Sequence, residues 1–406
     1  GVMIVTGGRL ADMFGRRKAF FLGTAIFASM SALGGAAQSE AWLIAARTLM
    51  GIGGALMWPA ILGMTYALLP EDKAGLAGGI VIGAAGLGNA MGPLLGGVLT
   101  DALSWRWIFF LNVPISVFAV LVTWLLVRVK EPEVAERRLD YGGIAALSVG
   151  LVALLIALDQ VAEWGWGDPR VVGLFALAAA LLVAFVPIER RAGTAALVPR
   201  SVMRNESFTA SCLAILFMSA TFFAALLYLP QFMQKQLGYS PLEAGVGMLP
   251  MLGTFALVSF VAGPLYNRLG AKALASVGAG CIAVAPFLFS QVDAGSGYGA
   301  LVPGMVVLGI GIGSFYPTAT TAGVTAVDES QTSLAGGIVY MFQIAGGSIG
   351  LGLTTTVFSA QVPPFVDGIQ AAFRLDAALS LLGFLIALAF VGGRLLPRRQ
   401  TPGSAR

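Results

Sequence analysis

The sequence predicts an all-α protein that crosses a membrane many times, and three observations support this fold class. Hydrophobic residues make up 57% of the 406 residues and charged residues only 11%, whereas a soluble domain carries about 25% charged residues. The apolar residues fall into long runs, and a run of about 20 residues lets a helix cross a hydrocarbon core of about 30 Å. The third observation is an internal repeat, which predicts two similar halves.

The apolar runs predict twelve complete crossings, separated by short loops that hold most of the charged residues. The expected spans are residues 18–38, 42–69, 74–100, 106–128, 140–160, 171–188, 208–231, 243–262, 272–291, 299–324, 332–360 and 372–395. The opening residues, GVMIVTGG, reach a charged loop too soon to span a membrane, and Gly1 is not a start methionine. We therefore expect the chain to begin inside a helix. A signal peptide is not expected, because a basic start and a cleavage site are missing.

Lysine and arginine are concentrated in alternate loops. Nineteen of the 24 lie on one side of the expected membrane and five on the other. Cytoplasmic loops carry the excess of these residues, so the loop at 9–18 and the C-terminal tail are expected in the cytoplasm. The net charge of +4 follows from this topology and gives no reason to expect a nucleic-acid partner.

Composition also excludes several kinds of function. The chain has no histidine, which excludes imidazole acid/base chemistry, haem ligation and most zinc sites. Cys212 and Cys281 lie in apolar runs and are expected to pack rather than to form a disulfide or a metal site. None of the five lysines follows a glycine, so a GK[ST] phosphate-binding loop is excluded. We expect no enzyme activity, metal, cofactor or nucleotide. Any active transport would have to draw on an ion gradient or on another subunit.

The internal repeat is visible by eye. Residues 49–81 align without a gap on 307–339 at an offset of 258, and 8–17 align on 263–272 at an offset of 255. Seven expected spans separate the two copies of the longer repeat, so both copies cross the membrane in the same direction. Two halves in parallel orientation are one of the repeat arrangements found in secondary transporters.

Five stretches carry a family resemblance. The motif residues are Gly8, Asp12, Gly15, Arg16 and Arg17 in GRLADMFGRRK, Arg47 in LIAARTLMGIGGA, and Gly88, Gly92, Pro93, Gly96 and Gly97 in GNAMGPLLGG. The others are WRWIFFLNVP at 105–114 and YLPQFMQKQLGYSPLEAGVGMLP at 228–250. In this order they resemble the major facilitator superfamily, and within it the fourteen-helix drug/proton antiporter branch.

The resemblance implies two six-helix bundles with two inserted central helices. On that numbering the twelve spans are helices three to fourteen, and the first helix and most of the second are missing. The expected division is 1–128 for the N-terminal bundle, 129–207 for a cytoplasmic linker and the inserted helices, 208–395 for the C-terminal bundle and 396–406 for a cytoplasmic tail.

Arg47 matches the arginine of the family's fourth helix, and two interpretations remain open. Its side chain could reach outward to the membrane surface, and its repeat counterpart, Met305, indicates that the fold does not require a cation there. The resemblance implies instead that Arg47 faces a central cavity and couples transport to protonation of a carboxylate. The carboxylates near the outer helix ends and loops are Asp101, Asp159, Glu163 and Asp293. We expect the partner of Arg47 in the missing first helix.

The charged loop motif also has two interpretations. Arg16 and Arg17 could serve only to orient the chain in the membrane. Alternatively, Asp12 pairs with a neighbouring arginine and with the positive N-terminus of a helix in the other half, which would stabilise one closed state. Gly8 and Gly15 would permit the tight turn that this latch needs.

The glycines of the 88–97 stretch recur every four residues, at Gly88, Gly92 and Gly96. Small residues at this spacing allow helices to pack closely, which is one interpretation. The family resemblance implies another, a bend near Pro93 that prevents ion leak. The stretch lacks the GxGxxG spacing and a preceding strand, so it does not predict a dinucleotide site.

Polar and aromatic residues interrupt several apolar spans. They are Trp58, Asn89, Phe222, Phe223, Tyr316, Tyr340 and Gln343. Each could face lipid or pack between helices; together they predict a nearly uncharged aromatic cavity suited to lipophilic or cationic compounds. The sequence therefore predicts a proton-coupled efflux transporter of the cell membrane, expected to be a monomer. A dedicated exporter of an endogenous metabolite or antibiotic and a non-transporting sensor remain alternatives.

Overall fold

The computed structural model describes residues 3–128, 139–360 and 365–392. All regular structure within these residues is helical. Residues 129–138, which belong to the expected linker segment 129–207, lie outside the described residues. The expected tail at 396–406 lies outside them as well.

The N-terminal half contains the first five α-helices. They are α1 (Ile4–Phe14), α2 (Arg16–Gly35), α3 (Glu40–Leu68), α4 (Ala74–Ala102) and α5 (Arg106–Leu126), with the 3-10 helix η1 (Glu71–Lys73) before α4. Two long helices follow with two short elements, namely α6 (Tyr141–Trp164), α7 (Pro169–Ala192), η2 (Gly193–Ala195) and α8 (Arg200–Met203).

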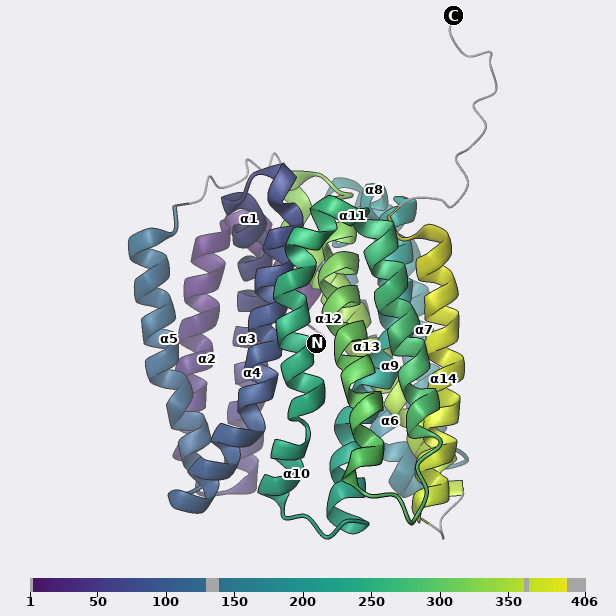
Figure 1. Ribbon diagram of the computed structural model, residues 1–406. Coiled ribbons are helices and arrows are strands. Elements are labelled where there is room, and N and C mark those ends of the chain that lie inside the picture. Colours follow the sequence, from purple (N-terminus) through teal and green to yellow (C-terminus); the bar gives the residue numbers. More distant parts are fainter. Residues whose placement is uncertain (1–2, 129–138, 361–364, 393–406) are drawn as a thin grey trace, which may run out of the picture.

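The C-terminal half contains the remaining elements. They are α9 (Glu206–Lys235), α10 (Pro241–Gly247), α11 (Leu249–Phe289), α12 (Tyr298–Val324), η3 (Glu329–Gln331), α13 (Thr332–Ala360) and α14 (Phe365–Phe390). In Figure 1 the two halves stand side by side with their helices upright, α1 to α5 on the left and α9 to α14 toward the right. We call the end of the bundle that carries α1 the upper end and the end that carries α10 the lower end.

Polar residues set the starts of several helices. Ser39, Asn205 and Ser240 each accept a backbone N–H of the first turn that would otherwise lack a partner. Ser240 does so in a capping box with Glu243. These caps occur just before apolar runs, so they fix where the chain leaves a loop and enters a long helix.

The count of membrane crossings depends on α11. Eleven continuous helices among the described residues are long and apolar enough to span a membrane, but one of them, 241–289, has 49 residues. A straight helix of that length would be about 74 Å long, far more than a bilayer requires. Gly270, at φ 80°, breaks α11, and the chain turns back there (Figure 1). Two spans therefore lie within α11, and the predicted twelve crossings are present.

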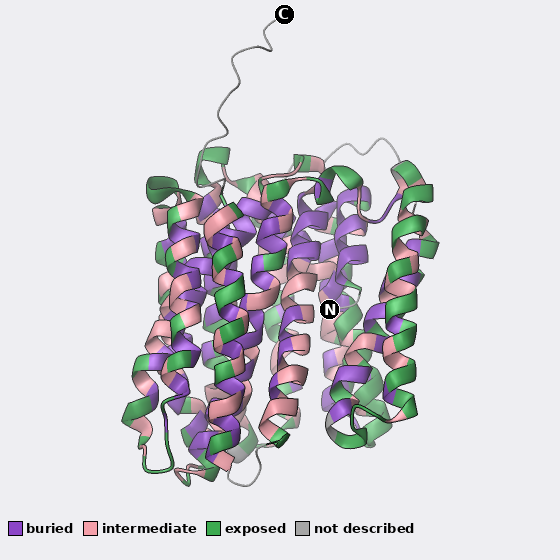
Figure 2. Cartoon of the chain, turned by 90° about the vertical axis from the view of Figure 1, so that its right-hand side faces the viewer, coloured by how far each residue is buried: buried purple, intermediate pink, exposed green. Residues whose placement is uncertain are grey.

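The bundle has the surface of a protein surrounded by lipid. Figure 2 shows buried residues where helices face one another and exposed residues on the periphery and at both ends. Large apolar side chains lie open on the outside, including Leu126 at 75% exposure and Phe118 at 68%. Such an extensive apolar surface fits a membrane and not water.

Candidate functional site

Asp12 joins the two halves at the upper end. Its carboxylate accepts the backbone N–H of Leu334 at 2.8 Å and that of Ser333 at 3.3 Å. Both donors belong to the first turn of α13, where N–H groups have no partner within the helix and the helix dipole is positive. Asp12 is only 3% exposed, so this contact is made away from water. The structure places Asp12 against the opposite half, at the position that the latch interpretation requires.

Arg16 completes the same contact. Its Nε lies 3.2 Å from the Asp12 carboxylate, its Nη1 donates to the Gly63 carbonyl at 3.1 Å and its Nη2 donates to the Glu329 carbonyl at 2.6 Å. Because Glu329 belongs to the C-terminal half, the guanidinium bridges both halves. Arg16 is 1% exposed, so a purely topogenic role, which needs only a charge at the membrane surface, does not account for its position. Arg17 contacts the Phe21 ring and the Trp124 carbonyl within its own half.

The short helix η3 holds the Glu329 carbonyl in place. Asp328 caps this helix by accepting the Ser330 hydroxyl at 2.6 Å and the Ser330 backbone N–H at 2.9 Å. These two hydrogen bonds favour the ionised carboxyl and hold the pKa of Asp328 below its usual range.

The two copies of the internal repeat make equivalent contacts between the halves. A Cβ atom on Gly8 would lie 2.9 Å from the Cα of Leu334, and one on Gly263 would lie 3.0 Å from the Cα of Leu76. Leu76 and Leu334 are repeat counterparts, so each half packs a glycine against the start of the equivalent helix in the other half. The turns that follow are equivalent too, since Gly15 and Gly270 both have positive φ, 111° and 80°.

The charged contact occurs in only one copy. In the C-terminal half Asn267 replaces Asp12 and Ala271 replaces Arg16. The close approach of glycine to helix is therefore a property of both halves, whereas the buried ion pair belongs to one.

The halves also meet at the lower end, through two of the motif stretches. A Cβ atom on Gly245 of α10 would lie 2.8 Å from the Pro93 Cβ, and one on Gly97 would lie 2.6 Å from the Leu242 Cδ1. The interpretation of tight packing at Gly88 and Gly92 is wrong, because nothing lies within 4 Å of a Cβ atom built at either position. Gly88 instead lines a cavity.

A central cavity of about 440 Å³ lies between the halves. All seven residues predicted to face a cavity line it, namely Trp58, Asn89, Phe222, Phe223, Tyr316, Tyr340 and Gln343. They come from α3, α4, α9, α12 and α13, so both halves contribute. Their assignment to substrate binding remains a prediction.

Aromatic rings dominate the walls of this cavity. Phe222 packs edge-on against Phe223, with ring centroids 5.8 Å apart, and Trp58 packs against Tyr340 at 5.0 Å. The Tyr316 hydroxyl is already engaged by Ser219 at 2.9 Å. The indole N–H of Trp58 is buried without a hydrogen-bond partner. The site thus offers ring faces, the side-chain amides of Asn89 and Gln343 and the indole N–H of Trp58, and its lining includes no charged side chain.

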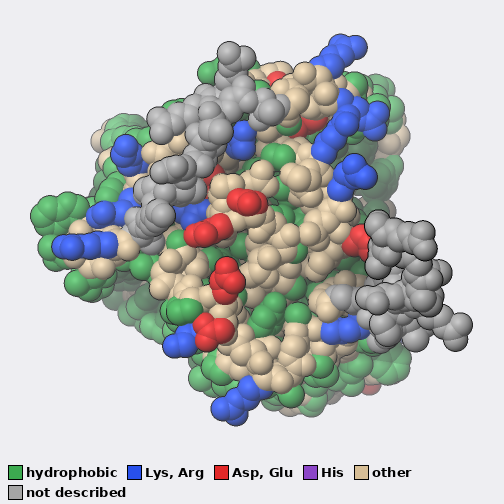
Figure 3. Space-filling view, turned by 90° about the horizontal axis from the view of Figure 1, so that it is seen from above, with side chains coloured by type: hydrophobic (Ala, Val, Ile, Leu, Met, Phe, Trp, Pro, Cys, Tyr) green, Lys and Arg blue, Asp and Glu red, His purple; other side chains and the backbone are tan. Residues whose placement is uncertain are grey.

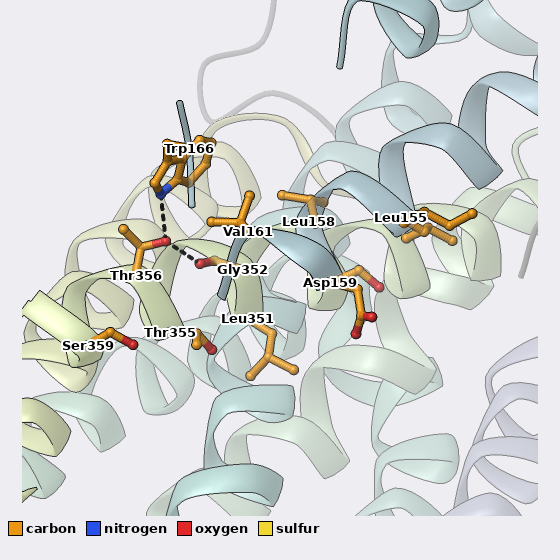
Figure 4. Close-up of a pocket in the computed structure, with 12 residues that line it drawn as sticks. Leu155, Leu158, Asp159, Val161, Trp166, Leu351, Gly352, Thr355, Thr356 and Ser359 are labelled. Carbon is orange, nitrogen blue, oxygen red and sulfur yellow. Dashed lines mark hydrogen bonds between the residues drawn. The ribbon is translucent and has the colours of Figure 1, made fainter. Parts of the chain in front are cut away.

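A second cavity of about 670 Å³ lies between α6 and α13 toward the lower end. Figure 4 shows Trp166 hydrogen-bonded to Thr356, together with Asp159 and Thr355. Sequence reasoning missed this cavity, because it forms only where an inserted helix packs on α13. Among the described residues no three His, Cys, Asp or Glu side chains come together as a metal site would require.

Arg47 lies apart from the central cavity. It is an exposed residue of α3 with its guanidinium 6.0 Å from the centre of the Phe109 ring. No salt bridge joins it to a carboxylate among the described residues. Its proposed coupling role therefore remains a prediction.

One membrane-embedded carboxylate was missed. The last span was predicted at residues 372–395, which puts Asp376 near its start, and the carboxylate partner of Arg47 was expected in the missing first helix. The structure corrects this, because α14 begins at Phe365 and Asp376 lies well inside it. Asp376 is 0% exposed, and neither carboxyl oxygen has a hydrogen-bond partner.

The family follows from comparison with known proteins. The model of the Major Facilitator Superfamily matches residues 1–351 and 211–406, which together cover the whole chain. The chain belongs to the Major Facilitator Superfamily. It is therefore a multi-pass membrane transporter and not an enzyme.

Relatives and a solved structure agree with this assignment. The chain is 32% identical to the tetracenomycin C resistance and export protein of Streptomyces glaucescens over 89% of this chain and 67% of that protein. It is 34% identical to the puromycin resistance protein pur8 of Streptomyces alboniger, over 98% of this chain and 79% of that protein. The crystal structure of the human organic anion transporter MFSD10 shares the fold, with a TM-score of 0.68 and 18% identity. The match covers 95% of this chain and 80% of that chain.

Proposed function

We propose that this transporter exports lipophilic or cationic small molecules across the cell membrane in exchange for protons. The observation that carries the proposal is the central cavity, whose walls come from both halves and consist mainly of aromatic and apolar side chains. Apolar surface favours lipophilic compounds, and ring faces attract cations. A sugar would need more hydrogen-bond donors than this lining offers, and a phosphate would need several arginines, which the lining lacks.

Alternating access would come from movement of one half against the other. The Asp12–Arg16 contact with α13 and η3 would close the route to the upper end, and its release would open the cavity there. The contact of Leu242 with Gly97 would act at the lower end. The parallel repeat supports this scheme, since equivalent contacts occur in the two halves.

We further propose that the upper end faces the cytoplasm. Seen from that end, lysine and arginine side chains lie around the rim of the molecule (Figure 3). This distribution agrees with the excess of basic residues that cytoplasmic loops carry. Export would then begin with opening of the upper end. We expect a monomer that needs no cofactor besides the proton gradient.

A second candidate is the dedicated export of one compound. It is favoured by the two relatives, since one is named for tetracenomycin C and the other for puromycin. A cavity of about 440 Å³ is compatible with either a range of compounds or one of them.

Transport by the purified full chain tests the proposal. Inside-out vesicles with an acidic interior should accumulate a fluorescent lipophilic cation, and an uncoupler should release it. Empty vesicles provide the control. Movement of an antibiotic but of no dye would favour the dedicated exporter. Failure of every compound to move under a proton gradient would refute proton-coupled export.

A further inference from the structure

Asp376 lies near the middle of the membrane-spanning part of α14. It follows Phe365 by eleven residues and precedes Phe390 by fourteen, which correspond to about 17 Å and 21 Å of helix at 1.5 Å per residue. Its side chain is fully buried and both of its oxygens lack hydrogen-bond partners. The Ser380 hydroxyl donates to the backbone carbonyl of Asp376 at 2.7 Å and does not engage the carboxyl group.

A carboxylate ion does not fit this environment. A charge near the centre of a bilayer is unfavourable, and only a partner or water offsets the free-energy cost of burying it. The neutral acid is therefore the form that the structure accommodates. Even the neutral acid leaves buried polar atoms without partners, which is unfavourable. An apolar side chain would stabilise this position better, so stability gives no reason for an aspartate here.

Within the described part of the chain, no salt bridge joins Asp376 to a cation of the helices that pack against α14. Arg374, on α14 itself, is exposed and donates to Gln370, and Asp367 is exposed near the start of that helix. On α11, Lys272 donates to the Ala389 carbonyl at the upper end of α14. The other titratable groups of these helices are Cys212, Glu206, Tyr228 and Lys235 on α9, Arg268, Tyr266 and Cys281 on α11, and Tyr340 on α13. Of these, Tyr228 packs its ring directly against α14, at Phe373.

Tyr228 connects this region to the cavity between α6 and α13. Its ring packs against Phe373 on α14, with centroids 6.2 Å apart, and its hydroxyl lies 3.2 Å from Thr355 Oγ1. Thr355 lines the cavity toward the lower end (Figure 4). A hydroxyl group both donates and accepts a hydrogen bond, so this pair can pass a proton between water in that cavity and Tyr228. The last step needs the Asp376 carboxyl group to move to the Tyr228 hydroxyl, because its oxygens have no hydrogen-bond partner in this structure.

We propose that Asp376 is a proton-binding carboxylate of the C-terminal half, reached from the lower end through the hydroxyls of Thr355 and Tyr228. The inference rests on the proposed proton-coupled export and adds to it a second coupling position, far from Arg47. When the carboxylate is exposed during the cycle it takes up a proton from water at the lower end. The protonated acid can then be buried as it is in this structure, and the proton leaves when a later state opens to the upper end.

Asp376→Asn is the direct test, because an amide keeps the size and polarity of the acid but cannot take up a proton. Asp367→Asn is the matched control, since it makes the same change on the exposed face of the same helix. In vesicles the Asp376→Asn variant should lose proton-driven accumulation of the dye. It should retain exchange of labelled for unlabelled dye, which moves no net protons. Tyr228→Phe keeps the ring contacts and should slow proton-driven accumulation while leaving exchange unchanged.

Infrared difference spectroscopy of the purified protein provides a readout that does not depend on transport. The band of a buried protonated carboxyl group should be present in the wild type and in Asp367→Asn and absent in Asp376→Asn. Persistence of the band in Asp376→Asn, or unchanged proton-driven accumulation by that variant, would overturn the inference. If the wild type moves no dye under a proton gradient, the proposed function fails, while the band still decides whether Asp376 holds a proton.

Discussion

The Asp12 carboxylate of α1 accepts the backbone N–H of Leu334 in α13 at 2.8 Å, so an acid of one half caps a helix of the other. Gly8 makes the approach possible, because a side chain there would meet the backbone of Ser333. Leu334 begins the sequence LAGGIV that recurs from Leu76 onward. The contact therefore joins a charged loop motif to the internal repeat.

Asp12→Asn should open the upper end. Loss of one partner from a buried ion pair costs about 3 to 5 kcal/mol, which would raise the open population by a hundredfold or more. A cysteine at Leu62, which is 1% exposed, should then react faster with a maleimide. Asn267→Ala changes the counterpart in the other half and should leave the reaction rate unchanged. Equal rates in the two variants would argue against a latch.

Gly8→Ala should destabilise the folded protein by about 1 to 3 kcal/mol, the usual cost of overpacking. The added Cβ would lie 2.6 Å from the Ser333 carbonyl oxygen, and a backbone atom cannot move aside as a side chain can. Gly253→Ala is the control, because nothing lies within 4 Å of its Cβ position. Alanine there should be neutral or stabilising by about 0.5 to 1 kcal/mol. Thermal unfolding in detergent measures both variants.

Arg47→Ala should abolish export driven by the proton gradient while expression and membrane insertion stay normal. Its contact with the Phe109 ring contributes only about 0.5 to 1 kcal/mol at an exposed position, so the fold does not depend on it. Arg170→Ala removes a comparable contact with Trp164 and serves as the control. Export at the normal rate by Arg47→Ala would show that this arginine merely extends to the membrane surface.

Phe222→Ala should weaken binding of lipophilic substrates by about tenfold to a hundredfold, as expected for loss of about 1.5 to 3 kcal/mol of apolar contact. Phe222 contacts three other rings of the cavity region. Phe118→Ala removes a side chain that is 68% exposed on the outside and should leave affinity unchanged. Dye binding to folded protein, measured by fluorescence titration, separates affinity from stability. The same affinity in both variants would place the substrate elsewhere.

The residues of the central cavity were predictable because they interrupt apolar runs. Trp58 and Gln343 are easily recognised because the residues around them are mostly apolar. A polar side chain within a membrane-spanning helix is expected to face the interior of the helix bundle and not the lipid. The repeat was equally visible, and it predicted two similar halves in parallel orientation. The equivalent contacts of Gly8 and Gly263 became apparent only in the structure.

Asp376 was missed because hydropathy alone placed the last helix too late. The first turns of α14 contain Asp367 and Gln370, which lower the local hydropathy, yet Val366 and Ile369 are buried and the helix extends through them. The contact of Gly97 with Leu242 could not be foreseen either. No periodicity within one helix indicates which residue of the other half will face it.

A reversible cross-link at the upper end tests alternating access most directly. A Cβ atom at Gly336 of α13 would lie 3.3 Å from the Leu62 Cβ of α3, close to the range of about 3.5 to 4.5 Å found in disulfides. Leu62→Cys with Gly336→Cys, in a background with Cys212→Ala and Cys281→Ala, should therefore form a bond between the halves on oxidation.

Gly323→Cys with Ser211→Cys is the matched control, because its Cβ distance of 3.4 Å lies within the C-terminal half. Oxidation should stop dye accumulation by the first pair and not by the second, and a reductant should restore it. Full accumulation by protein that is completely cross-linked between Leu62→Cys and Gly336→Cys would contradict transport by movement of the two halves.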